Sequence, residues 1–472
     1  MKFKQLLDEL IRVSQKTKTD FALSMNMTSS GLSKMLSGKN IPVYKERYLF
    51  SRQAADFFAA SIFRPDCYLE LQSTFPVIYN FASKYELEGF LTLAIEYTLD
   101  EKYLGGSNEF QDRSDKGTAY LGQQTLLNMS CIIISDHLRS DPETKLEFFS
   151  YSGMFNQSYR KLLHRIRLAR PEKPWNVVLN HILAPSEDDL QPDQQQDVDY
   201  LSLLVKAEQY FDLKLWTTHV RPKQAFLFLK GKFLLTFSVQ LDGLPILFHI
   251  QSKTYLSLFM NSLMKRELTL VSYNRADAIS LLEANPEIRT KIANIKIDTA
   301  YNCIPPGYLA EKEDLEVSGF SGPNKDVILQ FFHNALTQTP LFVGSIEMMN
   351  SLYTSGTVLI PLYGPVHFSA SKVHAFLTRF AGYMKVRAQN PVKAVNTDLS
   401  GIAIFVAEDV TVLYITDLAF QREKFHCLRT EDVRGLLEKQ FANNPLIDVP
   451  VDIWKDYLDE LASRKDYISG LF

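Results

Sequence analysis

Apolar residues in the first sixty positions recur at steps of three and four. Residues 3–14 carry one such stripe, which predicts an amphipathic helix with a single buried face. The same spacing predicts two short helices over 17–25 and 28–37 and a long helix over 43–63. The chain therefore opens with a small all-α unit.

Capping residues support the bounds of the third helix. Thr28 or Ser29 can cap its first turn, because a side-chain oxygen accepts a hydrogen bond from an amide that no helical carbonyl satisfies. Gly38 ends the helix, since glycine readily adopts the left-handed conformation that closes many helices.

Helical spacing continues in the next part of the chain. Residues 69–99 fit helices, and residues 119–137 are helix-like with an isoleucine-rich end that equally fits a buried strand. Residues 157–170 predict a basic helix, either a second nucleic-acid contact or a solvated face paired with acids. The polar, glycine-containing stretch 104–118 predicts a loop.

Beyond residue 213 the pattern changes to aromatic and β-branched runs. Such runs, bounded by turn residues, predict strands. The expected strands cover 225–229, 232–241, 246–250, 268–273, 357–361, 401–406 and 410–415. The expected helices between them cover 254–265, 275–284, 324–336, 369–387 and 430–443. Strands interleaved with helices predict an α+β or α/β body.

A chain of 472 residues is too long for one ordinary core, so a multidomain protein is expected. We expect an all-α DNA-binding domain over 1–64, a helical linker or dimerisation region over 65–183, and an α+β body over 200–472. Residues 184–199 are acidic and rich in glutamine, which predicts a linker.

Charge is distributed unevenly along the chain. Residues 1–64 hold eleven Lys and Arg against five Asp and Glu, a balance of +6, whereas the whole chain has a net charge of -3. The remaining residues therefore carry a net charge of -9. A basic head on an acidic body is typical of a DNA-binding domain attached to a sensing or oligomerisation body.

The sequence holds no motif of a nucleotide-binding or hydrolytic enzyme. GxxxxGK[ST], GxGxxG and GxSxG are absent, and the four cysteines and nine histidines lack metal-ligating spacings. We therefore expect no enzyme activity, no cofactor and no metal. The scattered cysteines favour a reducing cytoplasm, and no apolar run approaches the roughly 18 residues that a membrane span requires.

Residues 20–42, DFALSMNMTSSGLSKMLSGKNIP, resemble a known DNA-binding motif. Ala22 is small where two helices of the motif cross, and Asn26, four residues on, suits a turn position that needs positive φ. The core positions of the motif are occupied by Phe21, Met25, Met27, Leu32 and Met35. The segment resembles the phage-repressor (Cro/repressor, Xre-like) helix-turn-helix family, and the resemblance covers residues 3–64.

The resemblance implies that the third helix enters the major groove of double-stranded DNA with its N-terminal residues at the base edges. The residues at the base edges would be Thr28, Ser29, Ser30, Ser33 and Lys34. The residues at the phosphates would be Lys39, Lys18 and Lys16. One small domain reads few bases, so a homodimer on a palindromic operator is expected.

The chain departs from the family at the start of the second helix. The family often places a glutamine there to hold the phosphate backbone, whereas this chain has Lys18-Thr19-Asp20. An acid at this position favours DNA less than a glutamine does.

Together these features predict a sequence-specific DNA-binding transcriptional regulator whose body senses a small molecule or peptide, or oligomerises. One alternative is an effector or enzyme whose N-terminal helices serve only as a scaffold or autoregulatory DNA-binding module. Another is a protein–protein adaptor. In the body, Cys303, the loop 318–323 and the turn 361–367 near His374 are the features closest to a site, and packing is the expected role of each.

Overall fold

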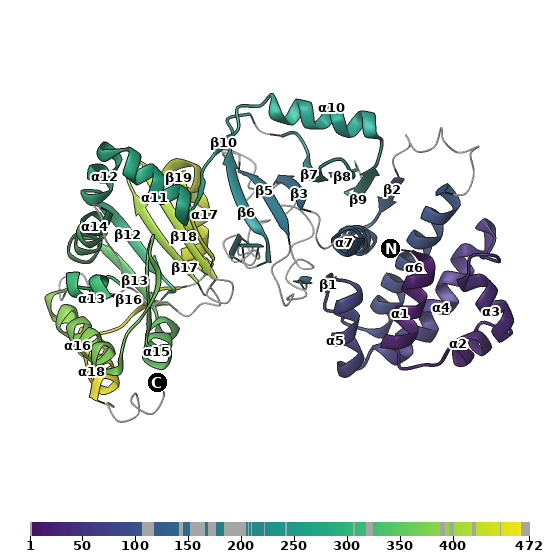
Figure 1. Ribbon diagram of the computed structural model, residues 1–472, viewed down its shortest axis with the longest axis horizontal. Helices are drawn as coiled ribbons and strands as arrows, with labels where there is room; N and C mark the ends of the chain where they lie inside the picture. Colours follow the sequence, from purple (N-terminus) through teal and green to yellow (C-terminus); the bar gives the residue numbers. More distant parts are fainter. Residues whose placement is uncertain are drawn as a thin grey trace.

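Figure 1 shows the computed structural model, in which N-terminal helices, a first sheet and a second sheet follow one another along the long axis. The structure describes residues 2–105, 118–140, 145–151, 166–168, 176–183, 204, 205, 207, 208, 210–220, 222–240, 243–304, 307–317, 324–387, 392–395, 401–417, 422–443 and 445–463. No helix in these ranges is long and apolar enough to cross a membrane.

The N-terminal part is helical, as the sequence predicts. Its elements are α1 (Phe3–Val13), α2 (Lys18–Ser24), α3 (Ser29–Leu36), the 3-10 turn η1 (Tyr44–Glu46), α4 (Arg47–Ile62), α5 (Pro65–Thr74) and α6 (Lys84–Gly105). The four helices expected over 3–63 are confirmed, the last of them as η1 followed by α4. A short strand, β1 (Val77–Tyr79), separates α5 from α6 and pairs with β4 (Ile166–Leu168).

The first sheet has eight strands in the order β10-β6-β5-β3-β7-β8-β9-β2. The strands are β2 (Thr118–Leu121), β3 (Leu146–Tyr151), β5 (Val177–Leu183), β6 (Asp212–Thr217), β7 (Ala225–Leu229), β8 (Phe233–Val239), β9 (Pro245–Ile250) and β10 (Thr269–Leu270). Strands β3, β5 and β6 are parallel, and the others pair antiparallel. Of the helices described beside this sheet, α7 covers Gln123–Ser140 and α10 covers Lys253–Met264.

The second sheet also has eight strands, in the order β11-β19-β18-β17-β12-β13-β16-β20. The strands are β11 (Ser272–Asn274), β12 (Ile297–Asn302), β13 (Leu341–Ser345), β16 (Lys393–Val395), β17 (Ile402–Ala407), β18 (Val410–Asp417), β19 (Arg422–Arg429) and β20 (Ile447–Asp448). Its helices are α11 (Arg275–Ala284), α12 (Pro286–Ala293), α13 (Lys312–Val317), α14 (Asn324–Gln338), α15 (Ile346–Ser355), α16 (Ala370–Val386), α17 (Thr430–Asn443) and α18 (Val451–Ser463). A separate hairpin joins β14 (Thr357–Ile360) to β15 (Gly364–His367).

The two sheets have the same topology. In each, three parallel strands lie side by side, an antiparallel two-residue strand closes one edge, and four antiparallel strands follow on the other side. Chain order is the same as well, with β2 equivalent to β11, β3 to β12, β5 to β13, β6 to β16, and β7–β10 to β17–β20. The body is therefore a tandem repeat of one mixed-sheet unit.

Strand register supports this repeat. Thr118 faces His249 in the first sheet, and Ser272 faces His426 at the equivalent place in the second. Each histidine follows a phenylalanine, and the next helix begins four residues after it in both units. We refer to residues 118–270 as the first repeat and to residues 272–448 as the second repeat.

The strands and helices expected beyond residue 213 are present, with one difference. The run 268–273 was expected to form one strand, but it is divided into β10, which pairs with β6, and β11, which pairs with β19. The amide of Val271 donates to the carbonyl of Leu215 in β6, and the carbonyl of Val271 accepts from Cys427 in β19. This segment therefore joins the edges of the two repeats.

The expectation of a helical region over 65–183 is correct for α5, α6 and α7 and wrong for β1–β5, which also lie there. Strands β3 and β5 are buried on both faces, so they lack the alternation by which a half-buried strand is recognised. The basic helix expected over 157–170 is contradicted at 166–168, which form β4.

Four predicted features lie wholly or mainly outside the described residues. They are the rest of the basic helix, the linker 184–199, the loop 318–323 and most of the loop 104–118.

The N-terminal helices and the first repeat share one hydrophobic core. This core runs from Leu6 and Phe58 through Phe90 and Ile132 to Leu235. A second core lies between the second repeat and α18, and a third joins residues of both repeats. The helical head is therefore packed on the body.

Candidate nucleic-acid interface

Helices α2 and α3 are joined by a tight turn whose backbone requires Asn26. Asn26 has a φ of 53°, and the amide of Met27 donates to the carbonyl of Ala22. Asparagine tolerates this left-handed conformation better than other residues with a Cβ. Ala22 is buried at the start of this turn, as expected for a small residue between two crossing helices.

A compact apolar core holds the four helices in place. Phe21 of α2 stacks on Phe58 of α4 with ring centroids 4.9 Å apart, and Phe3 of α1 lies 6.1 Å from Phe50. The inward face of α3 contributes Leu32, Met35 and Leu36, all of which are buried. With its apolar residues committed to this core, α3 presents only polar and basic side chains outward.

The N-terminus of α3 is capped as the sequence predicts. The Thr28 hydroxyl accepts a hydrogen bond of 3.0 Å from the amide of Gly31. Gly38, with a φ of 81°, follows the last turn and ends the helix.

All eight residues expected at the interface are exposed in the structure. They are Thr28, Ser29, Ser30, Ser33 and Lys34 on α3 and its cap, Lys39 just after it, and Lys16 and Lys18 at the start of α2. Each of these side chains is therefore accessible to a binding partner.

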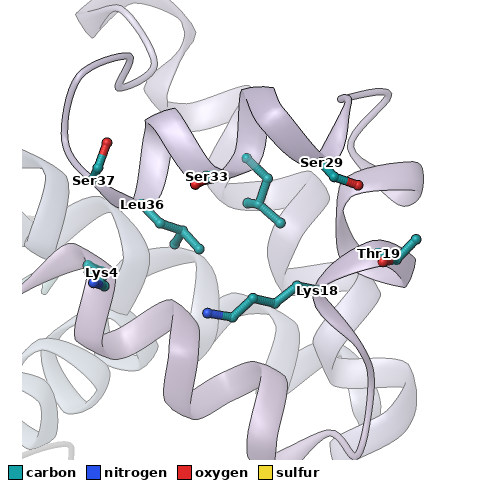
Figure 2. A pocket seen from close by; sticks show the side chains of 8 residues that line it. Lys4, Lys18, Thr19, Ser29, Ser33, Leu36 and Ser37 are labelled. Atoms are coloured by element: carbon teal, nitrogen blue, oxygen red, sulfur yellow. The ribbon is translucent and has the colours of Figure 1, made fainter.

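A groove of about 220 Å³ lies between α3 and the starts of α1 and α2. Its lining comprises Lys4, Lys18, Thr19, Ser29, Leu32, Ser33, Leu36 and Ser37. Figure 2 shows the Lys18 side chain extending through the space between α1 and α3, with Lys4 on the α1 side. Sequence reasoning missed Lys4, because only the crossing of α1 and α3 brings it to this groove.

Lys18 has an intramolecular partner. Its Nζ lies 2.7 Å from Oδ1 of Asp8 on α1. The Lys18 side chain is 60% exposed, so this pair is screened by solvent and contributes little to stability. A phosphate contact by Lys18 would therefore have to replace or share this ion pair.

The N-terminus of α2 is closed by its own residues. The hydroxyl and amide of Thr17 both donate to the Asp20 carboxylate, and the Thr17 hydroxyl accepts from the Asp20 amide. These hydrogen bonds lower the pKa of Asp20, so its side chain is ionised at neutral pH. This capping box gives Asp20 a structural role at the start of α2, so its carboxylate is engaged within the helix.

Ion pairing differs between two sides of the helical unit α1–α4. On the side packed against α5, α6 and α7, five basic groups have an acidic partner: Arg12 with Glu70, Arg47 with Asp100, Arg52 with Glu88, Lys84 with Asp56 and Arg139 with Glu9. Within the described part of the chain, Lys4, Lys16, Lys34 and Lys39 form no ion pair. Unpaired positive charge therefore lies around α3, where an anion can approach.

The three features noted in the body are structural where they are described. Cys303 is buried. The turn expected over 361–367 is a turn only at 361–363, the tip of the β14–β15 hairpin, because residues 364–367 form β15. Nδ1 of His374 contacts the carbonyl oxygen of Ala462. Across the described ranges, no group of three His, Cys, Asp or Glu side chains is placed to hold a metal ion.

Comparisons with known proteins give little further information. No protein-family model matches the chain, and no curated protein matches it. Among solved structures, it is similar to TrmBL2, an archaeal chromatin protein described as showing a novel mode of DNA binding. The identity is 12% and the TM-score 0.20, over 50% of this chain and 97% of that one. A similarity at this level carries no argument about fold or function.

Proposed function

We propose that this protein is a cytoplasmic, sequence-specific DNA-binding transcriptional regulator. In this proposal α1–α4 form a helix-turn-helix domain of the phage-repressor type, with α3 as the recognition helix. The observation that carries the proposal is the outer face of α3, which is exposed and free of large apolar groups. Of the lysines around it, Lys18 pairs with Asp8, and the others form no ion pair with the described residues.

The exposed side chains divide into two roles. Ser29, Ser30, Ser33 and Lys34 would meet base edges, since hydroxyls accept or donate and a lysine reaches guanine acceptors. The lysines beside them would contact phosphates, which give affinity without sequence information. Lys4 joins Lys16 and Lys39 in this second role because it lies in the groove beside α3.

Few base contacts from one head favour a homodimer on a palindromic operator. The two-repeat body then serves as the oligomerisation or sensing module. Because the head shares a hydrophobic core with the first repeat, a rearrangement of the body would move α3 with it.

The alternative function, a scaffold, would use a different surface of the N-terminal helices. Packing against the body uses α1, α4 and the paired charges Arg12, Arg47 and Arg52, which a scaffold would need. A scaffold gives no reason for the exposed serines and unpaired lysines of α3. The outer face of α3 therefore favours DNA binding over scaffolding.

Fluorescence anisotropy with the full-length protein tests this proposal. A duplex is first selected from a random-sequence pool by binding to the wild-type protein. The double variant Ser33→Ala/Lys34→Ala should weaken binding to that duplex by at least about tenfold, because base-edge contacts are worth roughly 1–3 kcal/mol each.

The matched control is Lys253→Ala/Ser257→Ala, which removes the same residue types from the exposed face of α10 in the body. Its affinity should equal that of the wild type. Equal affinity of the Ser33→Ala/Lys34→Ala variant and the control would contradict the role of α3.

A further inference from the structure

A cleft of about 790 Å³ lies where the two repeats meet. Its walls come from the starts of β3, β5 and β6 in the first repeat and of β19 and α11 in the second. The segment containing Val271, which joins the edges of the two sheets, runs beside it. A volume of this size is typical of sites for small-molecule ligands, which often lie between structural units.

Basic side chains predominate in this cleft. Five of them line it, Lys145, Lys214, Arg275, Arg422 and Lys424, against three acids, Asp212, Asp277 and Glu423. The chain beyond residue 64 is acidic overall, so a basic cleft departs from its surroundings. A concave wall with an excess of one charge concentrates ligands of the opposite charge.

Two ion pairs build the floor of the cleft. Arg275 Nε lies 2.6 Å from Glu423, and Lys424 Nζ lies 2.5 Å from Asp212. Glu423 also accepts hydrogen bonds from the amide of Leu362 and the hydroxyl of Tyr414, so its charge is fully engaged.

Lys145 and Lys214 have no ion-pair partner among the residues that the structure describes. They come from the first-repeat side of the cleft, whereas Arg422, whose guanidinium also donates to the carbonyl of Glu208, comes from the second repeat. The two lysines are therefore available for a ligand.

The first repeat provides an internal reference for the second. By strand register, Pro245, Ile246 and Leu247 of β9 correspond to Arg422, Glu423 and Lys424 of β19. The same unit therefore folds with apolar residues at these positions. Arg422 and Lys424 therefore place positive charge at the junction between the repeats, at positions where the first repeat has apolar residues.

We propose that this cleft binds a small phosphorylated molecule, held by Lys145 and Lys214 from the first repeat and Arg422 from the second. Several separate cations on different strands suit a phosphate group with more than one charge. The cleft is far too small for a DNA duplex. Because the ligand contacts both repeats, its binding fixes their relative orientation.

Isothermal titration calorimetry on the full-length protein tests this inference without DNA, so its outcome is independent of the proposed DNA binding. The probes are inorganic pyrophosphate, ADP and, as a carboxylate-only anion of similar charge, citrate. Pyrophosphate and ADP should each saturate a single site. Citrate should bind at least about tenfold more weakly than pyrophosphate.

Variants locate the site. Lys145→Glu/Lys214→Glu should weaken pyrophosphate binding at least about tenfold, whereas Lys145→Arg/Lys214→Arg should retain it. The control Lys253→Glu/Lys265→Glu makes the same charge change on exposed positions of α10 and just after it, and should bind as the wild type does.

Three results would overturn the inference. The first is the absence of saturable binding by pyrophosphate and ADP up to about 5 mM, which is weaker than metabolite sites of functional affinity. The second is an equal loss of affinity in the Lys253→Glu/Lys265→Glu control, which indicates general charge attraction. The third is citrate binding as tightly as pyrophosphate, which contradicts recognition of phosphate.

Discussion

At the residue scale, two glycines both have positive φ, but at only one of them would a side chain also clash with neighbouring atoms. Gly401 has a φ of 75°, and a Cβ there would lie 2.4 Å from the carbonyl oxygen of Thr416. Gly231 has a φ of 70° but open space around it. Only the first position is therefore closed to a side chain by its neighbours as well as by its own backbone.

Gly401→Ala should destabilise the protein more than Gly231→Ala does. The second change costs about 1 kcal/mol, the strain of a Cβ in a left-handed conformation. The first adds a clash with backbone that cannot rotate away, so its cost should exceed about 2 kcal/mol. The urea midpoint measures both, and equal shifts for the two variants would contradict the close approach at Gly401.

Three buried histidines lower the free energy of unfolding at acid pH. Burial lowers the pKa of His181 and His249 to about 4 and that of His426 to about 3, from the ordinary 6.5. The unfolded chain therefore binds more protons below pH 6.5, and stability falls as the pH drops through this window. Burial also raises the pKa of Glu208 from 4.5 to about 8. Between these two pH values the folded chain keeps a proton on Glu208 that the unfolded chain has released.

We expect maximal stability near pH 6.5. Below it, a net uptake of about two protons on unfolding gives a loss approaching about 3 kcal/mol per pH unit. Above it, Glu208 is still protonated when folded and ionised when unfolded, so stability declines until about pH 8. Urea midpoints across pH 5–8 measure this profile. Glu208→Gln should remove the alkaline decline, and a decline that persists would contradict the assignment.

At the element scale, the ion pair between α1 and α2 restrains one of the lysines beside α3. Asp8 holds Lys18 and also places a negative charge near the groove. Asp8→Asn keeps the shape of the side chain and removes this charge. In the proposed DNA complex it should raise affinity several-fold and steepen the dependence of log K on log salt by about 0.9, one additional phosphate contact.

The control for this variant is Asp56→Asn, which releases Lys84 on α6, away from the groove. It should leave the salt dependence unchanged. The comparison is made by anisotropy titrations at several salt concentrations, and a steeper slope for both variants would show that net charge alone is responsible.

The local pattern of apolar and polar residues was sufficient to predict the N-terminal helices but not the pairing of strands in the sheets. The turn at Asn26, the cap at Thr28 and the stop at Gly38 are local properties, and each was predicted. Pairing in a sheet is not local, so the division of residues 269–274 between two sheets left no trace in their apolar pattern. The groove residue Lys4 was missed for the same reason, because it depends on how two helices cross.

The repeat was equally hidden from sequence reasoning. Equivalent strands keep their pairing and register but share few residues, as Leu247 and Lys424 illustrate. Strand pairing is made by the backbone, so many side-chain sequences satisfy it. The shared pairs Phe248-His249 and Phe425-His426 are too short to be recognised without the register.

At the scale of the whole molecule, the packed N-terminal unit extends beyond the domain boundary that the sequence predicts at residue 64. Helix α4 is buried on most sides, because it packs on α1 and α2 and on α5 and α6 as well. A cut at residue 64 would expose the face of α4 that α6 covers. The sequence-based domain 1–64 is thus only part of the packed head.

A fragment of residues 1–64 should therefore fold poorly by itself. Its circular dichroism signal per expected helical residue should be much weaker than that of a fragment of residues 1–105, in which the packing of α5 and α6 is restored. Removing apolar partners costs roughly 25 cal/mol for each Å² of surface exposed, enough to unfold a domain this small. Equal cooperative melting of the two fragments would contradict the shared core.

The central claim is that the outer face of α3 reads DNA sequence, and a hydroxyl-radical footprint on the selected duplex tests it most directly. We predict protection of two half-sites on one face of the duplex, with centres about one helical turn or a multiple of it apart. In the Ser33→Ala/Lys34→Ala variant this protection should be lost, while the Lys253→Ala/Ser257→Ala control retains it. Uniform protection along the duplex, or the same footprint from both variants, would contradict the claim.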